Sequence, residues 1–127
     1  MFNIEENEAI YGKEIREKYG DAVMDAANAH IEGLDEKARA EGERLRVAVE
    51  KALAAAVRTG EPGGVLARKV CDYHKQWLMV YYPNYSKEYH IALAHMYAED
   101  ERFKDFYDKI TPGCAEFLRD AIISYCE

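Results

Sequence analysis

Three of the four histidines, His74, His90 and His95, lie in the second half of the chain and are the residues best suited to chemistry. His90 and His95 are five positions apart, about 140° round an α-helix, so they cannot share a face. His74 and His90 fall on separate expected helices beside a turn at Pro83, so they can converge. Two histidines with no carboxylate or thiolate at ligand spacing are a poor zinc site. His74 therefore has three open interpretations: a partly buried core residue with one hydrogen bond, a residue lining a ligand pocket, or a metal or haem ligand.

Aromatic side chains are crowded around these histidines. A buried core usually prefers Leu, Ile and Val, and a buried tyrosine needs a partner for its hydroxyl. A row of Tyr and Trp suits a surface that stacks on flat molecules and forms contact hot spots. The alternative is that tyrosine replaces phenylalanine in an ordinary core, and spacing alone does not separate the two. The cluster consists of Tyr73, Trp77, Tyr81, Tyr82, Tyr85, Tyr89 and Tyr97.

The motifs of common enzyme classes are not found. The sequence has no Gly-rich phosphate loop, GxSxG or HExxH, and Ser86 is better explained as a helix cap. We therefore expect no enzymatic activity and no cofactor. Cys71, Cys114 and Cys126 are odd in number and form no CxxC pair, which disfavours a disulfide framework or a zinc site. Cys71 and Cys114 are expected to face the core as small hydrophobic residues.

Composition limits the class of protein further. The chain has 127 residues, 49% of them apolar, which suits one domain with one core. Its net charge of −7 disfavours direct binding of nucleic acid or of an anionic membrane. The N-terminus has no signal-peptide pattern and no apolar run is long enough to cross a bilayer. These features predict a cytoplasmic protein, as a monomer or weak homodimer.

The periodicity of apolar residues predicts an all-α fold of about six or seven helices. A loop at residues 59–64 (TGEPGG) divides a charged, alanine-rich half from an aromatic half. The first half is expected to hold helices at 5–19, 21–31 and 35–58, with Gly42 inside the third at a cost of roughly 1 kcal/mol. The second half is expected to hold helices at 64–82, 87–98 and 101–110 and a last one starting at Thr111. Asp35, Ser86, Asp100 and Thr111 are the expected N-caps, with Pro112 at the first position of the last helix.

Several stretches resemble a known family, the TipAS antibiotic-recognition domain, which forms the C-terminal half of some MerR-type transcriptional activators. They are YGKEIREKYGD (11–21), HKQWL (74–78), YYP (81–83), SKEYH (86–90), MYAEDERF (96–103), YDKITPG (107–113) and FLRDAI (117–122). The resemblance implies a globin-like helical fold without haem, and binding of cyclic thiopeptides or other large drug-like compounds. It also implies that the aromatic segment lines a cleft and that N-terminal helices close over it. We therefore expect a single domain at 1–127, with residues 1–60 as a possible lid and residues 64–127 as the core helices.

The chain departs from the family pattern in three respects: the missing N-terminal helices, a missing cysteine and an additional tyrosine at the turn. The DNA-binding winged helix and dimerising helix that usually precede this domain are not in the chain. The type member carries, just after its turn, a cysteine that bonds covalently to thiopeptides, whereas residues 83–86 here read Pro-Asn-Tyr-Ser. The additional tyrosine at this turn favours a different, flatter ligand held without a covalent bond.

The resulting hypothesis is non-enzymatic binding of a large aromatic antibiotic, by a drug sensor or a sequestering resistance protein. Trp77, Tyr81, Tyr82 and Tyr85 are the expected stacking surfaces, with His74, His90 and Asn84 as polar contacts. Leu78, Leu93 and Tyr97 complete the expected ligand-binding set. The alternative is an interaction or dimerisation module that uses the same aromatic face.

Overall fold

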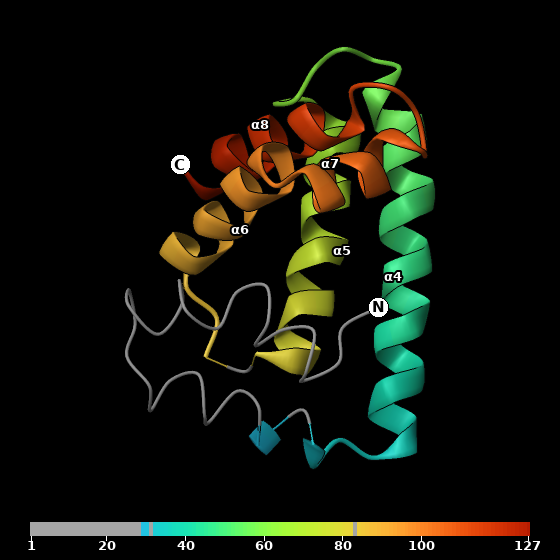
Figure 1. The fold of residues 1–127 in the computed structure, drawn as a ribbon, viewed down its shortest axis with the longest axis vertical. Coiled ribbons are helices and arrows are strands. Elements are labelled where there is room, and N and C mark those ends of the chain that lie inside the picture. Colours follow the sequence, from blue (N-terminus) through green and yellow to red (C-terminus); the bar gives the residue numbers. More distant parts are fainter. Residues whose placement is uncertain (1–28, 31, 83) are drawn as a thin grey trace.

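The computed structural model describes residues 29, 30, 32–82 and 84–127, and all regular structure among them is helical (Figure 1). The all-α prediction is therefore confirmed. The helices expected at 5–19 and 21–31 and the turn residue Pro83 lie outside the described residues, apart from the end of the second helix. The helices are α4 (Glu36–Val57), α5 (Val65–Tyr81), α6 (Lys87–Glu99), α7 (Glu101–Asp108) and α8 (Cys114–Cys126).

The two longest helices, α4 and α5, form an antiparallel pair joined by the Gly-rich loop (Figure 1). Asp35 caps α4 by accepting a 2.8 Å hydrogen bond from the Ala38 N–H, as its position predicted. The pair is tight at Gly42, which is buried beneath the ring of Tyr81. A Cβ atom at position 42 would lie 3.0 Å from Tyr81 Cζ and nearer still to the hydroxyl oxygen. Gly42 therefore permits the close approach of Tyr81, despite the poor helix propensity of glycine.

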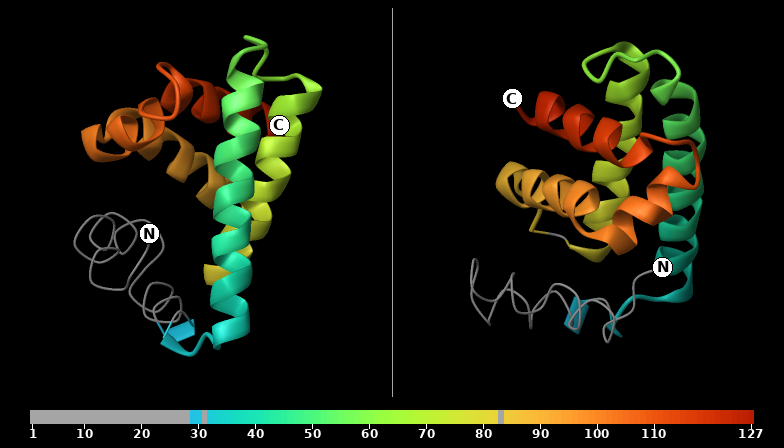
Figure 2. Two further views of the ribbon diagram at one scale, coloured as in Figure 1. Left: turned by 90° about the vertical axis from the view of Figure 1, so that its right-hand side faces the viewer. Right: turned by 45° about the horizontal axis from the view of Figure 1, so that its top comes forward.

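The three C-terminal helices lie together on one side of the α4–α5 pair (Figure 2). Helix α8 packs against α6 and also contacts α4, α5 and α7. This arrangement buries one continuous core that includes both halves of the sequence. Its largest fully buried apolar members are Leu45, Leu53, Val70, Leu78, Tyr97, Leu118 and Ile122.

The N-caps of α6 and α7 agree with the sequence. Ser86 Oγ accepts a 3.1 Å hydrogen bond from the Tyr89 N–H, and Asp100 Oδ1 accepts one of 3.0 Å from the Arg102 N–H. These side chains bind backbone donors that the first helical turn leaves unpaired.

The N-cap expected for the last helix was wrong. Helix α8 begins at Cys114, after Gly113 with φ of 91°, and not at Thr111 and Pro112. Glycine adopts this left-handed conformation without steric cost, so the chain turns once more before the helix starts. The Thr111 hydroxyl donates to the Ile110 carbonyl instead, at 2.8 Å. The Asp108 carboxylate accepts a 3.0 Å hydrogen bond from the Ala115 N–H and thus caps α8 from the end of α7.

No helix in the described part of the chain is both long enough and apolar enough to cross a membrane.

Candidate functional site: a pocket beside Trp77 and a buried histidine pair

The histidines on α5 and α6 meet in the interior. His74 and His90 are 1% and 0% exposed, and His74 Nδ1 lies 2.8 Å from His90 Nε2. Their ring planes differ by only 7°. The predicted convergence of the two histidines is therefore confirmed, and both are more deeply buried than the sequence suggested. His95 lies on the same helix as His90 but is exposed.

Tyrosine hydroxyls extend this pair into a longer hydrogen-bonded relay. Tyr85 OH lies 2.8 Å from His90 Nδ1, and Tyr97 OH lies 3.2 Å from His74 Nε2. The hydroxyl of Tyr97 is in turn hydrogen-bonded to that of the buried Tyr107. We refer to Tyr85, His90, His74, Tyr97 and Tyr107 as the relay. It supplies the partners that buried Tyr and His side chains require.

Burial keeps both imidazoles neutral. It lowers the pKa of His74 well below its usual value, and the neighbouring His90 lowers it further. Burial and the nearby Lys75 ammonium lower the pKa of His90 to about 4. A neutral imidazole has one donor and one acceptor nitrogen. Each histidine therefore donates to one neighbour in the relay and accepts from the other.

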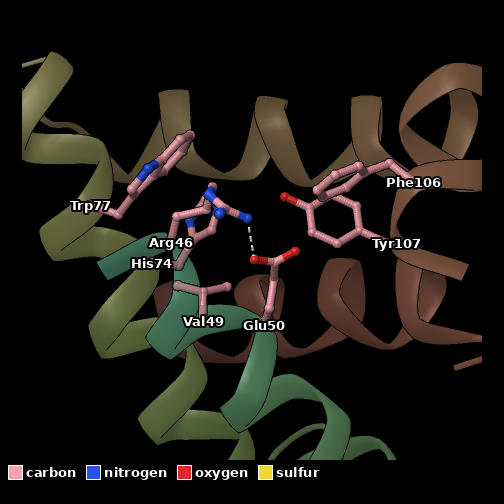
Figure 3. A pocket seen from close by; sticks show the side chains of 7 residues that line it. All are labelled: Arg46, Val49, Glu50, His74, Trp77, Phe106 and Tyr107. Carbon is pink, nitrogen blue, oxygen red and sulfur yellow. Dashed lines mark hydrogen bonds and ion pairs between the residues drawn. The ribbon is translucent and has the colours of Figure 1, made fainter. Parts of the chain in front are cut away.

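One end of the relay reaches a surface pocket beside Trp77, shown in Figure 3. The cavity volume is about 10 Å³, which is room for little more than one water molecule. Helices α4, α5 and α7 supply its walls, whereas the sequence suggested a cleft bounded by α5, α6 and N-terminal helices. The pocket is lined by Arg46, Val49, Glu50, His74, Trp77, Phe106 and Tyr107.

Charge in the pocket comes from α4. The Arg46 guanidinium forms ion pairs with Glu50, one turn further along the helix, and with Glu43, one turn before. The side chains of Arg46 and Glu50 are each 27% exposed, so the pair is only partly shielded from water. In Figure 3, Arg46 and Glu50 lie between Trp77 on one side and Phe106 and Tyr107 on the other.

The predicted ligand-binding residues take different positions. Only His74 and Trp77 line this pocket. Leu78, Tyr82, Leu93 and Tyr97 are buried in the core, and Tyr85 and His90 belong to the relay. Tyr81 is half-buried over Gly42, and Asn84 is exposed in the α5–α6 loop. Contact of any of these residues with a ligand remains a prediction.

The sequence analysis did not select Arg46, Glu50, Phe106 or Tyr107. Arg46 and Glu50 lie in the charged half of the sequence, and Phe106 and Tyr107 lie in the helix expected at 101–110. The available signal was a charged i, i+4 pair immediately beside the apolar stripe of Leu45, Val49 and Leu53. That signal does not reveal which other helix the pair faces.

Comparison with known proteins places the domain in a class of ligand-recognition modules. The TipAS antibiotic-recognition domain family matches residues 11–125. The chain belongs to this family.

Curated relatives are transcriptional activators. The HTH-type transcriptional activator mta of Bacillus subtilis is 26% identical over 138 aligned residues, covering 100% of this chain and 49% of the relative. The HTH-type transcriptional activator TipA of Streptomyces coelicolor is 28% identical over 118 residues, covering 90% of this chain and 46% of the relative. The chain therefore spans about half the length of these relatives. No solved structure gives a significant match.

Proposed function

We propose that the domain binds a large aromatic antibiotic reversibly, with the pocket beside Trp77 as part of the binding site. The observation that carries this proposal is a pocket with an aromatic wall in a member of an antibiotic-recognition family. Among the predicted residues, Trp77 would stack on the ligand and His74 would form the polar floor. The remaining residues of the relay would hold His74 in place.

Non-covalent binding fits the placement of the thiols. Cys71, Cys114 and Cys126 are all buried free cysteines, and none of them lines the pocket. Burial raises the pKa of Cys71 to about 12, and it also raises the pKa values of Cys114 and Cys126. Since the thiolate is the nucleophile, these groups are poorly suited to attack a ligand at neutral pH.

The pocket alone does not account for a whole antibiotic. Drug-sized ligands occupy about 300–1,000 Å³, far more than the volume of about 10 Å³ in this pocket. The further contacts that we propose involve the N-terminal lid, which was expected within residues 1–60. Helix α4 within that range belongs to the core through Leu45 and Leu53, which confines the proposed lid to residues before α4. Those residues lie almost entirely outside the described part of the chain.

Fluorescence offers a direct test because Trp77 is the only tryptophan. The protein is titrated with thiopeptides and with unrelated aromatic antibiotics, and saturable quenching or a spectral shift is expected for at least one class. Isothermal calorimetry repeats the titration with Trp77→Leu, for which weaker binding is expected. Met79→Leu, at an exposed position of α5 that does not line the pocket, is the matched control. Absence of saturation by every compound up to high micromolar concentration would contradict the proposal.

The output of binding is either regulation or sequestration of the drug. A sensor must change conformation on binding, whereas a sequestering protein needs high abundance and high affinity. Comparing the cellular protein level with the drug level separates them. The alternative of an interaction module receives less support, since Tyr82 and Tyr97 of the aromatic face are at most 7% exposed. Its test is a measurement of molecular mass against protein concentration.

A further inference from the structure

An open groove with a volume of about 400 Å³ lies between α4 and α5, the two helices that run side by side in Figure 2. Its α4 side is lined by Ala48, Ala52 and Ala55, which share one helix face at i, i+4 and i+7. Its α5 side includes Leu66 and Tyr73, which are two turns apart. The groove is therefore bounded by the α4–α5 pair alone among the described helices.

This groove is separate from the pocket beside Trp77. Residues two apart on an α-helix point about 160° away from each other. Arg46 and Glu50 line the Trp77 pocket, whereas Ala48, which lies between them in the sequence, lines the groove. The two sites therefore use opposite sides of α4, and the groove has a role independent of the proposed ligand binding.

The groove is positively charged. Lys51 of α4 and Lys69 of α5 both line it and are exposed. Neither lysine forms an ion pair within the described part of the chain. The described residues that line the groove include no acidic side chain. A cationic groove is thus present on a chain whose net charge is −7.

Apolar surface accompanies these charges. Leu66 is 44% exposed at the groove, and the adjacent Val65 is 86% exposed. The Lys69 ammonium lies 5.9 Å from the centre of the Tyr73 ring, within the range of a cation–π contact. The alanines on α4 have short side chains, so another backbone can approach this helix closely. Burial of Leu66 and Val65 against a partner would remove exposed apolar area from water.

These properties together fit one kind of partner. An amphipathic helix can lay its apolar face into a groove between two helices. Acidic residues beside that apolar face would then pair with Lys51 and Lys69. A second copy that presented the same groove would bring like charges together, and a nucleic acid would gain little from the apolar lining.

We propose that the α4–α5 groove is a docking surface for an acidic amphipathic helix of a partner protein. The apolar residues of that helix contact Leu66, Tyr73 and the alanines of α4. Its carboxylates pair with the two lysines. The inference adds an interaction surface to the domain and does not depend on the identity of any small ligand.

Synthetic peptides test the inference by fluorescence anisotropy. The first probe is a fluorescein-labelled helical peptide of about 14 residues, roughly 21 Å long, with leucine at every third or fourth position and glutamate elsewhere. Its dissociation constant should be on the order of 100 µM at low salt. A second peptide with lysine in place of glutamate should bind about tenfold more weakly. Non-specific attraction to a chain of net charge −7 would give the opposite preference.

A third peptide, with glutamine in place of leucine, tests the apolar part of the contact. It should also bind about tenfold more weakly than the first, since it has no apolar face to bury. Binding of the first peptide should weaken as the salt concentration rises, because exposed charges are screened.

Variants assign the charge preference to the groove. Lys51→Glu combined with Lys69→Glu should remove the preference for the glutamate peptide. Lys87→Glu combined with Lys109→Glu is the matched control, because it makes the same change in net charge at exposed positions outside the groove. This control should retain the preference.

A second pair of variants tests the apolar contact. Leu66→Ser should weaken binding of the glutamate peptide several-fold. Met79→Ser is its control, since Met79 is also 44% exposed on α5 but does not line the groove.

Four results would overturn the proposal. The first two are equal or tighter binding of the lysine peptide, and no saturation by the glutamate peptide at about 1 mM, tenfold above the expected constant. A third is self-association that Leu66→Ser abolishes, without peptide binding, which would assign the groove to a second copy. The fourth is tighter binding of a double-stranded DNA fragment than of the glutamate peptide, lost in the double lysine variant. The peptide comparison uses the unaltered protein, so a variant that fails to fold does not weaken it.

Discussion

His74 Nδ1 and His90 Nε2 are joined by a hydrogen bond of 2.8 Å, although the two residues lie on different helices and both are buried. The contact joins α5 to α6 within the core. Both rings are neutral at pH 7, so one proton occupies the space between Nδ1 of His74 and Nε2 of His90. The direction of this bond fixes the direction of the bonds to Tyr85 and Tyr97. The pair therefore links Tyr85 in the α5–α6 loop by hydrogen bonds to His74, which lines the pocket.

Stability should fall as the pH is lowered through the range in which histidine ordinarily titrates. The unfolded chain binds protons near pH 6.5, whereas the folded-state pKa of His90 is about 4 and that of His74 is also well below 6.5. The unfolded state therefore holds more protons, and the unfolding free energy should decrease below pH 6.5. Each buried histidine contributes a slope of up to about 1.4 kcal/mol per pH unit.

Urea denaturation between pH 7 and pH 5 measures this slope. His90→Gln, which keeps hydrogen-bonding capacity at the position, should reduce the slope by about half. His95→Gln, at an exposed position of the same helix, is the control and should leave it unchanged. Equal slopes for His90→Gln and the unaltered protein would contradict neutral burial of the pair.

Gly42→Ala should fail to stabilise α4. Alanine normally gains about 1 kcal/mol over glycine inside a helix, but the added Cβ would overlap the ring of Tyr81. The gain should return in a Tyr81→Ala background, and a double-mutant cycle in urea measures the coupling. Ala40→Gly, at an exposed position in α4, reports the intrinsic cost at a site without this contact. A full gain from Gly42→Ala alone would show that Tyr81 yields without cost.

Asp108→Ala should destabilise the domain by about 1 kcal/mol because α8 loses its N-terminal cap. Asp108→Asn retains a side-chain oxygen and should cost less. Thr111→Val should also cost less, since the Thr111 hydroxyl bonds the Ile110 carbonyl and not the start of α8. Thermal unfolding of the three variants ranks them, and the reverse order would restore Thr111 as the cap.

The three thiols should be unreactive in the folded protein. All are buried, and the pKa of Cys71 is raised to about 12 chiefly by burial. A disulfide-exchange reagent at pH 8 should label them slowly under native conditions and rapidly in urea. Binding of a ligand that stabilises the fold should slow native labelling further. Rapid native labelling would show that a cysteine is accessible to solvent.

Much of the helical framework could be predicted because its signals are local. The apolar spacing of α4 and α5 and the caps Asp35, Ser86 and Asp100 depend on residues within one or two turns. The start of α8 could not be predicted from the same kind of signal. Thr111 followed by Pro112 is a good helix beginning, but positive φ at Gly113 and a carboxylate from α7 shift the start to Cys114.

The sequence by itself determined the helical class, most helix bounds, the family resemblance and the concentration of His and Tyr between residues 73 and 97. The tertiary structure decided which of these side chains became core and which became pocket. It buried Tyr82 and Tyr97, paired His74 with His90, and brought Arg46 and Glu50 of α4 to the pocket that Trp77 lines. The periodicity of apolar residues indicates which face of a helix is apolar. The crossing of α4, α5 and α7, which sets the partners of that face, depends on packing between residues far apart in the chain.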